Sequence, residues 1–168
     1  MRVSTQKLET SGEDNLKWLT IYTDAGYANG VGTYGIWVRI FHGRRTFEGN
    51  LPKLHNNNEA EMYASVLGLE VGLAFWAEHY TVAPNGITIS TDSQHTRSRL
   101  SKNKLPHRTA SGKLLSQLEI DLHTKFYRLL PVGSKLNFKP VKGHSGTATT
   151  QKWLNNWCDK AAQRARKR

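Results

Sequence analysis

Short apolar runs separated by glycine-containing turns predict that the folded part of the chain begins with three β-strands. The runs are rich in the β-branched and aromatic residues that favour strands, and they have the length of strands rather than of helices. They cover residues 18–23 (WLTIYT), 33–41 (TYGIWVRIF) and 44–50 (RRTFEGN). Because only short turns separate them, the three strands are expected to form a meander.

A longer apolar segment follows, and its pattern predicts a central buried helix. From Glu59 to about Tyr80, hydrophobic residues lie nearly all round the helix rather than along one stripe. Gly68 and Gly72 lie on one side of it, one turn apart. Glycine weakens a helix by about 0.5–1 kcal/mol, so this pair indicates a flat surface for close packing.

The second half of the chain alternates between strand and helix patterns. Residues 86–91 (GITIST) predict a fourth strand, and a short basic helix is expected over 93–102. An amphipathic helix is expected over 111–126, with a core face made of Leu114, Leu115, Leu118 and Leu122. Residues 135–143 predict a fifth strand, and a helix is expected from about 150 to the end. This order predicts one mixed α/β domain, a five-stranded sheet flanked by helices.

Composition and charge narrow the classes of partner. The chain has 168 residues, and 24 Lys+Arg against 13 Asp+Glu leave a net charge of +11. Phosphates attract such a surface without sequence recognition, which makes nucleic acid the expected partner. We find neither an apolar run of roughly 20 residues nor a signal peptide, so we expect a soluble cytoplasmic protein. No membrane or obligate protein partner is indicated, and we expect a monomer.

The polar N-terminal residues, the cysteine content and the initiating methionine bear on the domain that we expect. Residues 1–16 are polar and aperiodic and are interpreted as a flexible leader, so that one domain spans 17–168. Cys158 is the one cysteine, which excludes an internal disulfide and a cysteine-based zinc site and indicates a packing role. The initiating Met1 and the full set of elements favour an independent protein.

Four isolated carboxylates provide the candidate chemistry. They stand at predicted strand ends or early in predicted helices, at Asp24, Glu61, Asp92 and Asp159. In a chain so poor in acids, such a set indicates a divalent-metal site, and hard oxygen ligands suit Mg²⁺ or Mn²⁺. Two carboxylates also have ordinary alternatives. Asp24 is a possible turn former before Ala25, and Asp92 a possible N-cap of the following helix.

Glu59 and Glu61 compete for this site. Helical residues two apart point about 200° away from each other, so only one of the two can face the other carboxylates. Glu59 is expected to stabilise the first turn of its helix.

Five segments resemble ribonuclease H, type 1, in their order and rough spacing. They are IYTDAG (21–26), NNEAEMYA (57–64), STDSQ (90–94), VKGHSG (141–146) and NNWCDKAA (155–162), and the resemblance spans about 18–163. It implies the ribonuclease H-like fold and an endoribonuclease that hydrolyses the RNA strand of RNA/DNA hybrids. It also implies two divalent cations, Mg²⁺ or Mn²⁺, held by four carboxylates.

The resemblance assigns a role to each site residue. It selects Glu61 over Glu59, makes Asp24 the ligand shared by both metals, and places Glu61 and Asp92 on the leaving-group side. It makes Asp159 a ligand of the metal that activates water. His144 would assist proton transfer or product departure near that metal; the alternative is a solvated loop histidine.

Substrate contacts follow from the same resemblance. It implies that Asn57, Asn58 and Gln94 contact 2′-hydroxyl groups, which both donate and accept hydrogen bonds; the alternatives are helix capping and surface solvation. Arg97 and Lys142 are further candidates. From 93 to 113 the chain carries six basic residues and no acid: Arg97, Arg99, Lys102, Lys104, Arg108 and Lys113. We interpret this segment as a phosphate-binding surface that lacks the tryptophan common in the family. Two interpretations of the basic tail stay open: it compensates with further phosphate contacts, or it is a frayed helix end that only adds solubility. The tail consists of Arg164, Arg166, Lys167 and Arg168.

Two other classes of function stay open. One is a catalytically silent nucleic-acid-binding module, which four concentrated carboxylates disfavour because they repel phosphates. The other is a junction resolvase or transposase-type enzyme on the same fold, which the Asn-Asn-x-x-Glu start and the VKGH loop disfavour.

Overall fold

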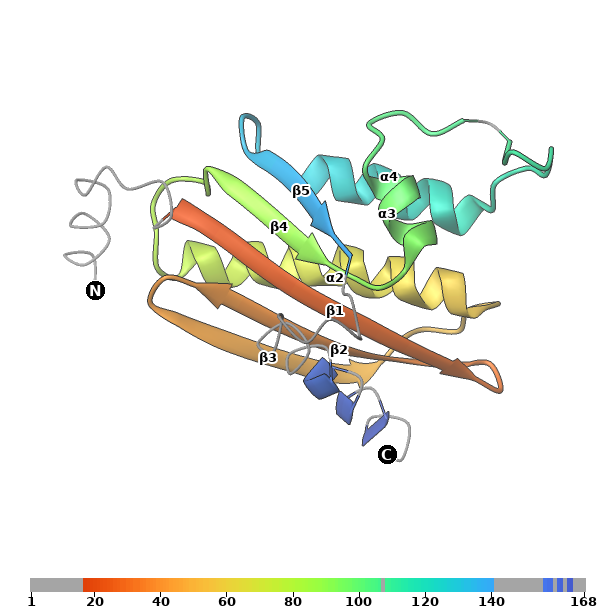
Figure 1. Cartoon of the computed structure of the whole chain (residues 1–168), viewed down its shortest axis with the longest axis horizontal. Helices are drawn as coiled ribbons and strands as arrows, with labels where there is room; N and C mark the ends of the chain where they lie inside the picture. The colour runs from red at the N-terminus through yellow and green to blue at the C-terminus, as the bar shows by residue number, and fades with distance from the viewer. Residues whose placement is uncertain (1–16, 107, 141–155, 159, 162, 165–168) are drawn as a thin grey trace.

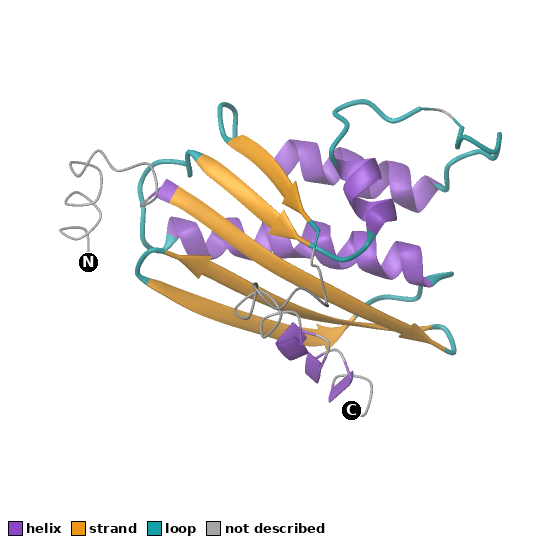
Figure 2. Cartoon of the chain, in the orientation of Figure 1, coloured by secondary structure: helices purple, strands orange, loops and turns teal. Residues whose placement is uncertain are grey.

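The computed structural model describes residues 17–106, 108–140, 156–158, 160–161 and 163–164. The predicted leader, most of the last helix, Lys142, His144 and Asp159 lie outside these residues. The described elements form one five-stranded mixed sheet with helices against it, in the strand order β3-β2-β1-β4-β5 (Figures 1 and 2). The predicted fold class is confirmed.

The first three strands form the predicted meander. β1 (Trp18–Ala28), β2 (Val31–Ile40) and β3 (Gly43–Asn50) pair antiparallel in chain order. β4 (Gly86–Ser90) and β5 (Lys135–Lys139) then add to the other side of β1 in parallel. The central strand β1 therefore has an antiparallel neighbour on one side and a parallel neighbour on the other.

β1 is five residues longer than predicted, which corrects the placement of Asp24. The strand continues past Asp24 because residues up to Ala28 pair with β2, where Asp24 lies opposite Gly35. Asn29 and Gly30 then close the hairpin with φ angles of 55° and 79°, as a two-residue type I′ turn requires. Asp24 is consequently a mid-strand residue and not a turn former.

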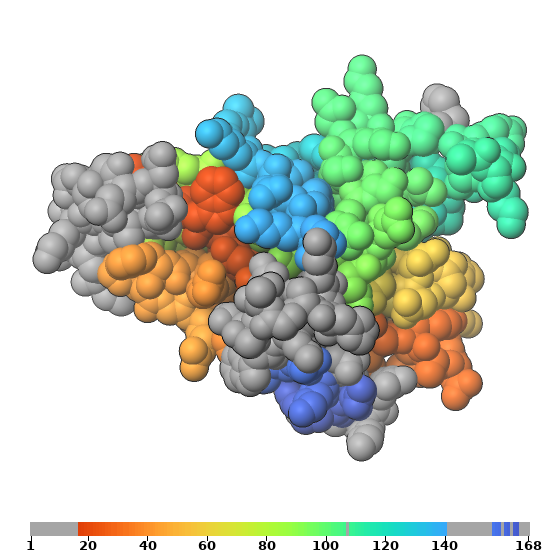
Figure 3. Space-filling view, in the orientation of Figure 1, coloured from red at the N-terminus to blue at the C-terminus, as the bar shows by residue number. Residues whose placement is uncertain are grey.

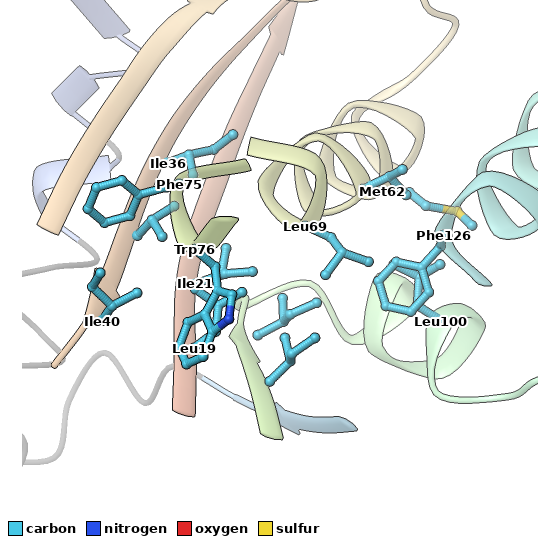
Figure 4. Packing of buried hydrophobic residues seen from close by; sticks show 14 of the residues in the cluster. Leu19, Ile21, Ile36, Ile40, Met62, Leu69, Phe75, Trp76, Leu100 and Phe126 are labelled. Atoms are coloured by element: carbon cyan, nitrogen blue, oxygen red, sulfur yellow. The ribbon is translucent and has the colours of Figure 1, made fainter. Parts of the chain in front are cut away.

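One face of the sheet carries the main hydrophobic core. The long helix α2 (Asn57–Ala77) packs on β1 and β2, and α4 (Gln117–Leu129) packs beside α2. Figure 4 shows side chains of this cluster, which include Leu19, Ile21 and Ile36 of the sheet, Leu69 of α2 and Phe126 of α4. Gly72 faces the sheet as predicted, since a Cβ atom there would come within 3.0 Å of the Ile21 Cδ1 atom.

The opposite face of the sheet is contacted by residues near the C-terminus. Tyr22 and Trp37 form a second cluster with Cys158 and Trp157. Cys158 is buried there, and its thiol lies 3.7 Å from the Tyr22 carbonyl oxygen, so its predicted packing role is confirmed. Among the described helices, none is long and apolar enough to cross a membrane.

The starts of two helices differ from the sequence-based predictions. α3 (Gln94–Leu100) is capped by Ser93, whose hydroxyl accepts from the Thr96 amide, and not by Asp92. α4 begins at Gln117, six residues later than predicted, where the Ser116 hydroxyl accepts from Glu119. Leu114, assigned to the core face, is 68% exposed in the preceding loop, whereas Leu115 and Leu122 are buried. Hydrophobic spacing continues through this loop, but the capping serine decides where the helix starts.

Candidate metal centre and nucleic-acid surface

Three of the four predicted carboxylates come together in the structure. Asp24 of β1, Glu61 of α2 and Asp92 of the loop after β4 each place one oxygen within 4.8 Å of the others. Asp24 and Glu61 are buried, and Asp92 is exposed, so the cluster opens to solvent on one side. Asp159, the fourth predicted ligand, and His144 lie outside the described residues.

The parallel pairing of β1 and β4 explains why two of these residues meet. The last pair in the register is Tyr22 with Ser90. Asp24 and Asp92 each stand two residues beyond that pair, so they lie at the same level of the sheet, where β4 has ended and β1 continues. Glu61 reaches the cluster from the first turns of α2, which crosses this end of β1.

The cluster is electrostatically unfavourable without cations. The pKa of Glu61 is raised to about 9, first by burial and then by the negative charges of Asp24 and Asp92. A backbone hydrogen bond from Ala25 acts in the opposite direction, whereas a side-chain hydrogen bond with Asp24 adds to the rise. Oε2 of Glu61 is buried and has no hydrogen-bond partner among the described residues. A buried carboxylate oxygen without a partner, beside two further carboxylates, fits a divalent cation with oxygen ligands.

Glu59 takes a separate role at the start of the same helix. Its Oε1 accepts a hydrogen bond from the His55 amide, at 2.8 Å, and lies 3.1 Å from His55 Nδ1, which donates to it when that nitrogen carries the proton. Its own amide donates to Oδ1 of the N-cap residue Asn56, at 2.9 Å. Glu59 is therefore buried in a capping arrangement, and Glu61 faces the cluster. The predicted helix phase is confirmed.

The residues expected to contact substrate lie beside the carboxylates. Asn57 and Asn58 are exposed in the first turn of α2, and Gln94 is exposed at the first position of α3, two residues after Asp92. None of the three is the cap of its helix, because Asn56 and Ser93 fill those positions. Helix capping, the ordinary alternative for these amides, is therefore excluded.

Two arginines of the basic segment are engaged with the protein itself. Arg97 donates from Nη1 to the Thr91 carbonyl oxygen at 2.6 Å. Arg99 contacts Glu119 of α4 at 3.3 Å, and the same Glu119 oxygen lies 2.6 Å from His95 Nε2. The absence of acids between 93 and 113 had suggested free charges, but the partner of Arg99 lies 20 residues further along the chain. Sequence spacing alone carries no signal for this pairing.

The rest of the basic segment is more open. Lys102, Lys104 and Lys113 are exposed, and Arg108 donates to the Gly112 carbonyl oxygen within the loop. The segment between α3 and α4 projects from the body of the molecule (Figures 1 and 3). In the predicted basic tail, Arg164 pairs with Glu48 of β3 at 3.1 Å, whereas Arg166, Lys167 and Arg168 lie outside the described residues.

Comparisons with known proteins agree with this architecture. The chain is 27% identical over 165 residues to a ribonuclease H of Desulforamulus reducens, covering 95% of this chain and 94% of that protein. It is 28% identical over 157 residues to a ribonuclease H of Rippkaea orientalis, covering 90% of this chain and 87% of that protein.

Solved structures show the same fold at lower identity. The N-terminal RNase H domain of a Mycobacterium tuberculosis protein matches with a TM-score of 0.62 at 16% identity, covering 88% of this chain and 98% of that one. LC11-RNase H1, solved in complex with an RNA/DNA hybrid, matches with a TM-score of 0.58 at 14% identity, covering 88% and 98%. The family model for RNase H matches residues 17–167. Since this match spans nearly the whole chain and includes the carboxylate-bearing elements, the chain belongs to the RNase H family.

Proposed function

We propose that this protein is an endoribonuclease that hydrolyses the RNA strand of RNA/DNA hybrids with the aid of two divalent cations, Mg²⁺ or Mn²⁺. The observation that carries the proposal is the convergence of Asp24, Glu61 and Asp92 within 4.8 Å, in a chain of the RNase H family. When bound, the two cations would supply an activated water on one side of the phosphorus and offset charge on the leaving oxygen on the other.

Different residues of the chain would bind the two cations. Asp24, which is buried within reach of both Glu61 and Asp92, is the ligand proposed to be shared. Glu61 and Asp92 would complete the leaving-group side, and the Glu61 oxygen that now lacks a partner would gain one there. Asp159 is proposed for the water side, and His144 for proton transfer or product departure beside it. Binding cations requires Glu61 to lose the proton that burial favours.

Strand choice is proposed to rest on the amides beside the cluster. Asn57, Asn58 and Gln94 are exposed and adjacent to Glu61 and Asp92 along the chain. Amide side chains can both donate to and accept from a 2′-hydroxyl, the group that distinguishes RNA from DNA. Lys142 is proposed as a further phosphate contact.

The test uses end-labelled substrates and the full chain in the oligomeric state that it adopts in solution, which we expect to be a monomer. RNA/DNA hybrid, double-stranded RNA, double-stranded DNA and a DNA duplex with a short ribonucleotide run are incubated with and without Mg²⁺. We expect Mg²⁺-dependent cuts in the hybrid and inside the ribonucleotide run. Comparable cleavage of the all-DNA duplex would replace this assignment with a resolvase-like one. Binding without any cleavage would indicate a silent module.

A further inference from the structure

Arg97 contacts the protein backbone on both sides of Asp92. Its side chain donates from Nη1 to the carbonyl oxygen of Thr91, at 2.6 Å. Its backbone amide donates to the carbonyl oxygen of Ser93, at 3.1 Å. The backbone contact is an ordinary helical hydrogen bond open to any residue except proline, but the contact with Thr91 requires a long side chain that donates at its end.

We propose that Arg97 is a positioning residue, which holds the loop carrying Asp92 in place and thereby sets the affinity of the carboxylate cluster for divalent cations. The inference deepens the proposed function and rests on it for the role of Asp92. It differs from the interpretation of Arg97 as a phosphate contact, because the arginine acts through the loop and not on nucleic acid.

The Asp92 loop has a specific need for such support. Asp92 belongs to no helix or strand, and its side chain is exposed, whereas Asp24 and Glu61 are buried on regular elements. The negative charge of Asp24, joined by that of Glu61 once it loses its proton, would push the Asp92 carboxylate towards solvent when no cation is bound. The loop ends are held by Thr91, whose amide donates to the Lys139 carbonyl oxygen at 3.3 Å, and by Ser93, which caps α3.

The hydrogen bond from Arg97 adds a contact from a charged donor at the Thr91 end of the loop. A donor that carries a formal charge makes shorter and stronger hydrogen bonds than a neutral one. Thr91 is fully buried and Arg97 is half-buried, so water competes poorly for this carbonyl oxygen. Groups that orient a metal ligand typically change metal affinity by about 10–100-fold when removed, and we place Arg97 in that class.

The experiment measures metal binding without nucleic acid. Arg97→Met keeps the aliphatic stem and removes the donor, and Arg99→Met is the matched control, since Arg99 lies on the same helix but pairs with Glu119. Mn²⁺ affinity is measured by electron paramagnetic resonance well below the melting temperature of each variant. We expect Arg97→Met to bind Mn²⁺ about 10-fold more weakly than the unmodified protein, and Arg99→Met to change by less than about 2-fold.

A second measurement separates positioning from phosphate contact. The dependence of log hybrid affinity on log salt, measured without divalent cations, is expected to be the same for Arg97→Met and the unmodified protein. A slope lowered by about 0.7–0.9 with unchanged Mn²⁺ affinity would make Arg97 a phosphate contact and overturn the inference. Unchanged Mn²⁺ affinity with an unchanged slope would overturn it as well.

Two further outcomes are distinguishable. If Arg97→Met does not fold, Arg97→Gln replaces it, because the glutamine side chain is shorter than that of arginine and carries no charge, and weaker Mn²⁺ binding is again expected. If the unmodified protein fails to cut hybrid while Arg97→Met still weakens Mn²⁺ binding, the proposed function fails and the positioning role stands.

Discussion

Gly68 of α2 lies so close to Thr23 of β1 that a Cβ atom at position 68 would stand 2.8 Å from the Thr23 Cγ2 atom. Thr23 is the residue before Asp24, and Gly68 lies seven residues, or two helical turns, after Glu61 on the same face of the helix. The contact therefore sets the height of α2 above β1. That height in turn sets the separation between the Asp24 and Glu61 carboxylates.

Gly68→Ala is expected to destabilise the protein by about 1–2 kcal/mol, although alanine in an open helix position gains about 1 kcal/mol over glycine. The added methyl would meet Cγ2 of Thr23 and Cγ2 of Ile21, at 2.8 and 2.9 Å, and neither β-branched side chain can turn away easily. Urea unfolding measures the effect. Gly43→Ala is the control, because nothing lies within 4 Å of a Cβ atom there, and it should stay within about 0.5 kcal/mol of the unmodified protein. Equal stability of the two variants would show that α2 can move away from the sheet.

Asp24→Asn and Asp92→Asn are each expected to lower Mg²⁺-dependent hybrid cleavage by at least about 100-fold, because an amide keeps the shape of the side chain but loses the charge that holds a dication. Circular dichroism and hybrid binding should stay near those of the unmodified protein. Asp121→Asn, on the exposed surface of α4, should keep full activity. Full activity in both cluster variants would refute the metal-site assignment.

Substitutions of the two neighbouring glutamates should have different effects on turnover. Glu61→Gln is expected to abolish cleavage, since Glu61 lies in the cluster. Glu59→Gln should lower the rate only slightly and cost about 1 kcal/mol of stability, because it weakens the hydrogen bonds to His55 at the helix start. Steady-state rates and urea unfolding measure the two effects. The opposite ranking of rates would mean that Glu59 serves the metal site.

Stability without divalent cations should fall as the pH rises. The pKa of Glu61 lies near 9 in the folded protein against 4.5 for the ordinary group, so the folded state holds a proton that the unfolded state releases. The stabilisation from this proton is complete below about pH 4.5 and declines up to about pH 9, by about 1.4 kcal/mol per pH unit within that window. Urea unfolding in the presence of a chelator, at pH 6, 7 and 8, measures the slope.

Glu61→Gln is the control for this pH dependence. Glutamine does not titrate, so the variant should lose most of the slope and be more stable than the unmodified protein at pH 8 in chelator. Mg²⁺ should stabilise the unmodified protein increasingly as the pH rises, because the cation replaces the proton. Parallel pH profiles for both proteins would show that Glu61 is not the group responsible.

Hybrid affinity is expected to depend more on the exposed lysines that follow α3 than on Arg99 within α3. Lys102→Gln with Lys104→Gln should lower the slope of log affinity against log salt by about 1.4–1.8, the effect of two phosphate contacts. Arg99→Gln should leave the slope nearly unchanged, because Glu119 already neutralises Arg99. If truncation after Gln163 lowers the slope and the lysine changes do not, the C-terminal tail is the main phosphate contact.

Much of the fold followed from local pattern. The alternation and length of apolar runs located the five strands that the structure describes, and the glycine pair in the long helix correctly indicated close packing on the sheet. Of the four carboxylates predicted as a set, Asp24, Glu61 and Asp92 do meet, and Asp159 lies outside the described residues. These features were predictable because strand and helix periods are local properties, and because acids are rare enough in this basic chain for isolated ones to stand out.

The remaining features depend on contacts between residues far apart in the chain. Leu114 fits a helical stripe, yet it is exposed because Ser116 caps the helix after it. Asp24 lies within β1 because β2 continues to pair beyond the point where β4 ends. Arg99 belongs to a run without acids, but α4 brings Glu119 to it, and Arg97 turns back to the Thr91 carbonyl oxygen. Residue types and periodicity thus determined which groups were available for chemistry, whereas the packing of elements decided which charges are neutralised within the protein and which can reach a substrate.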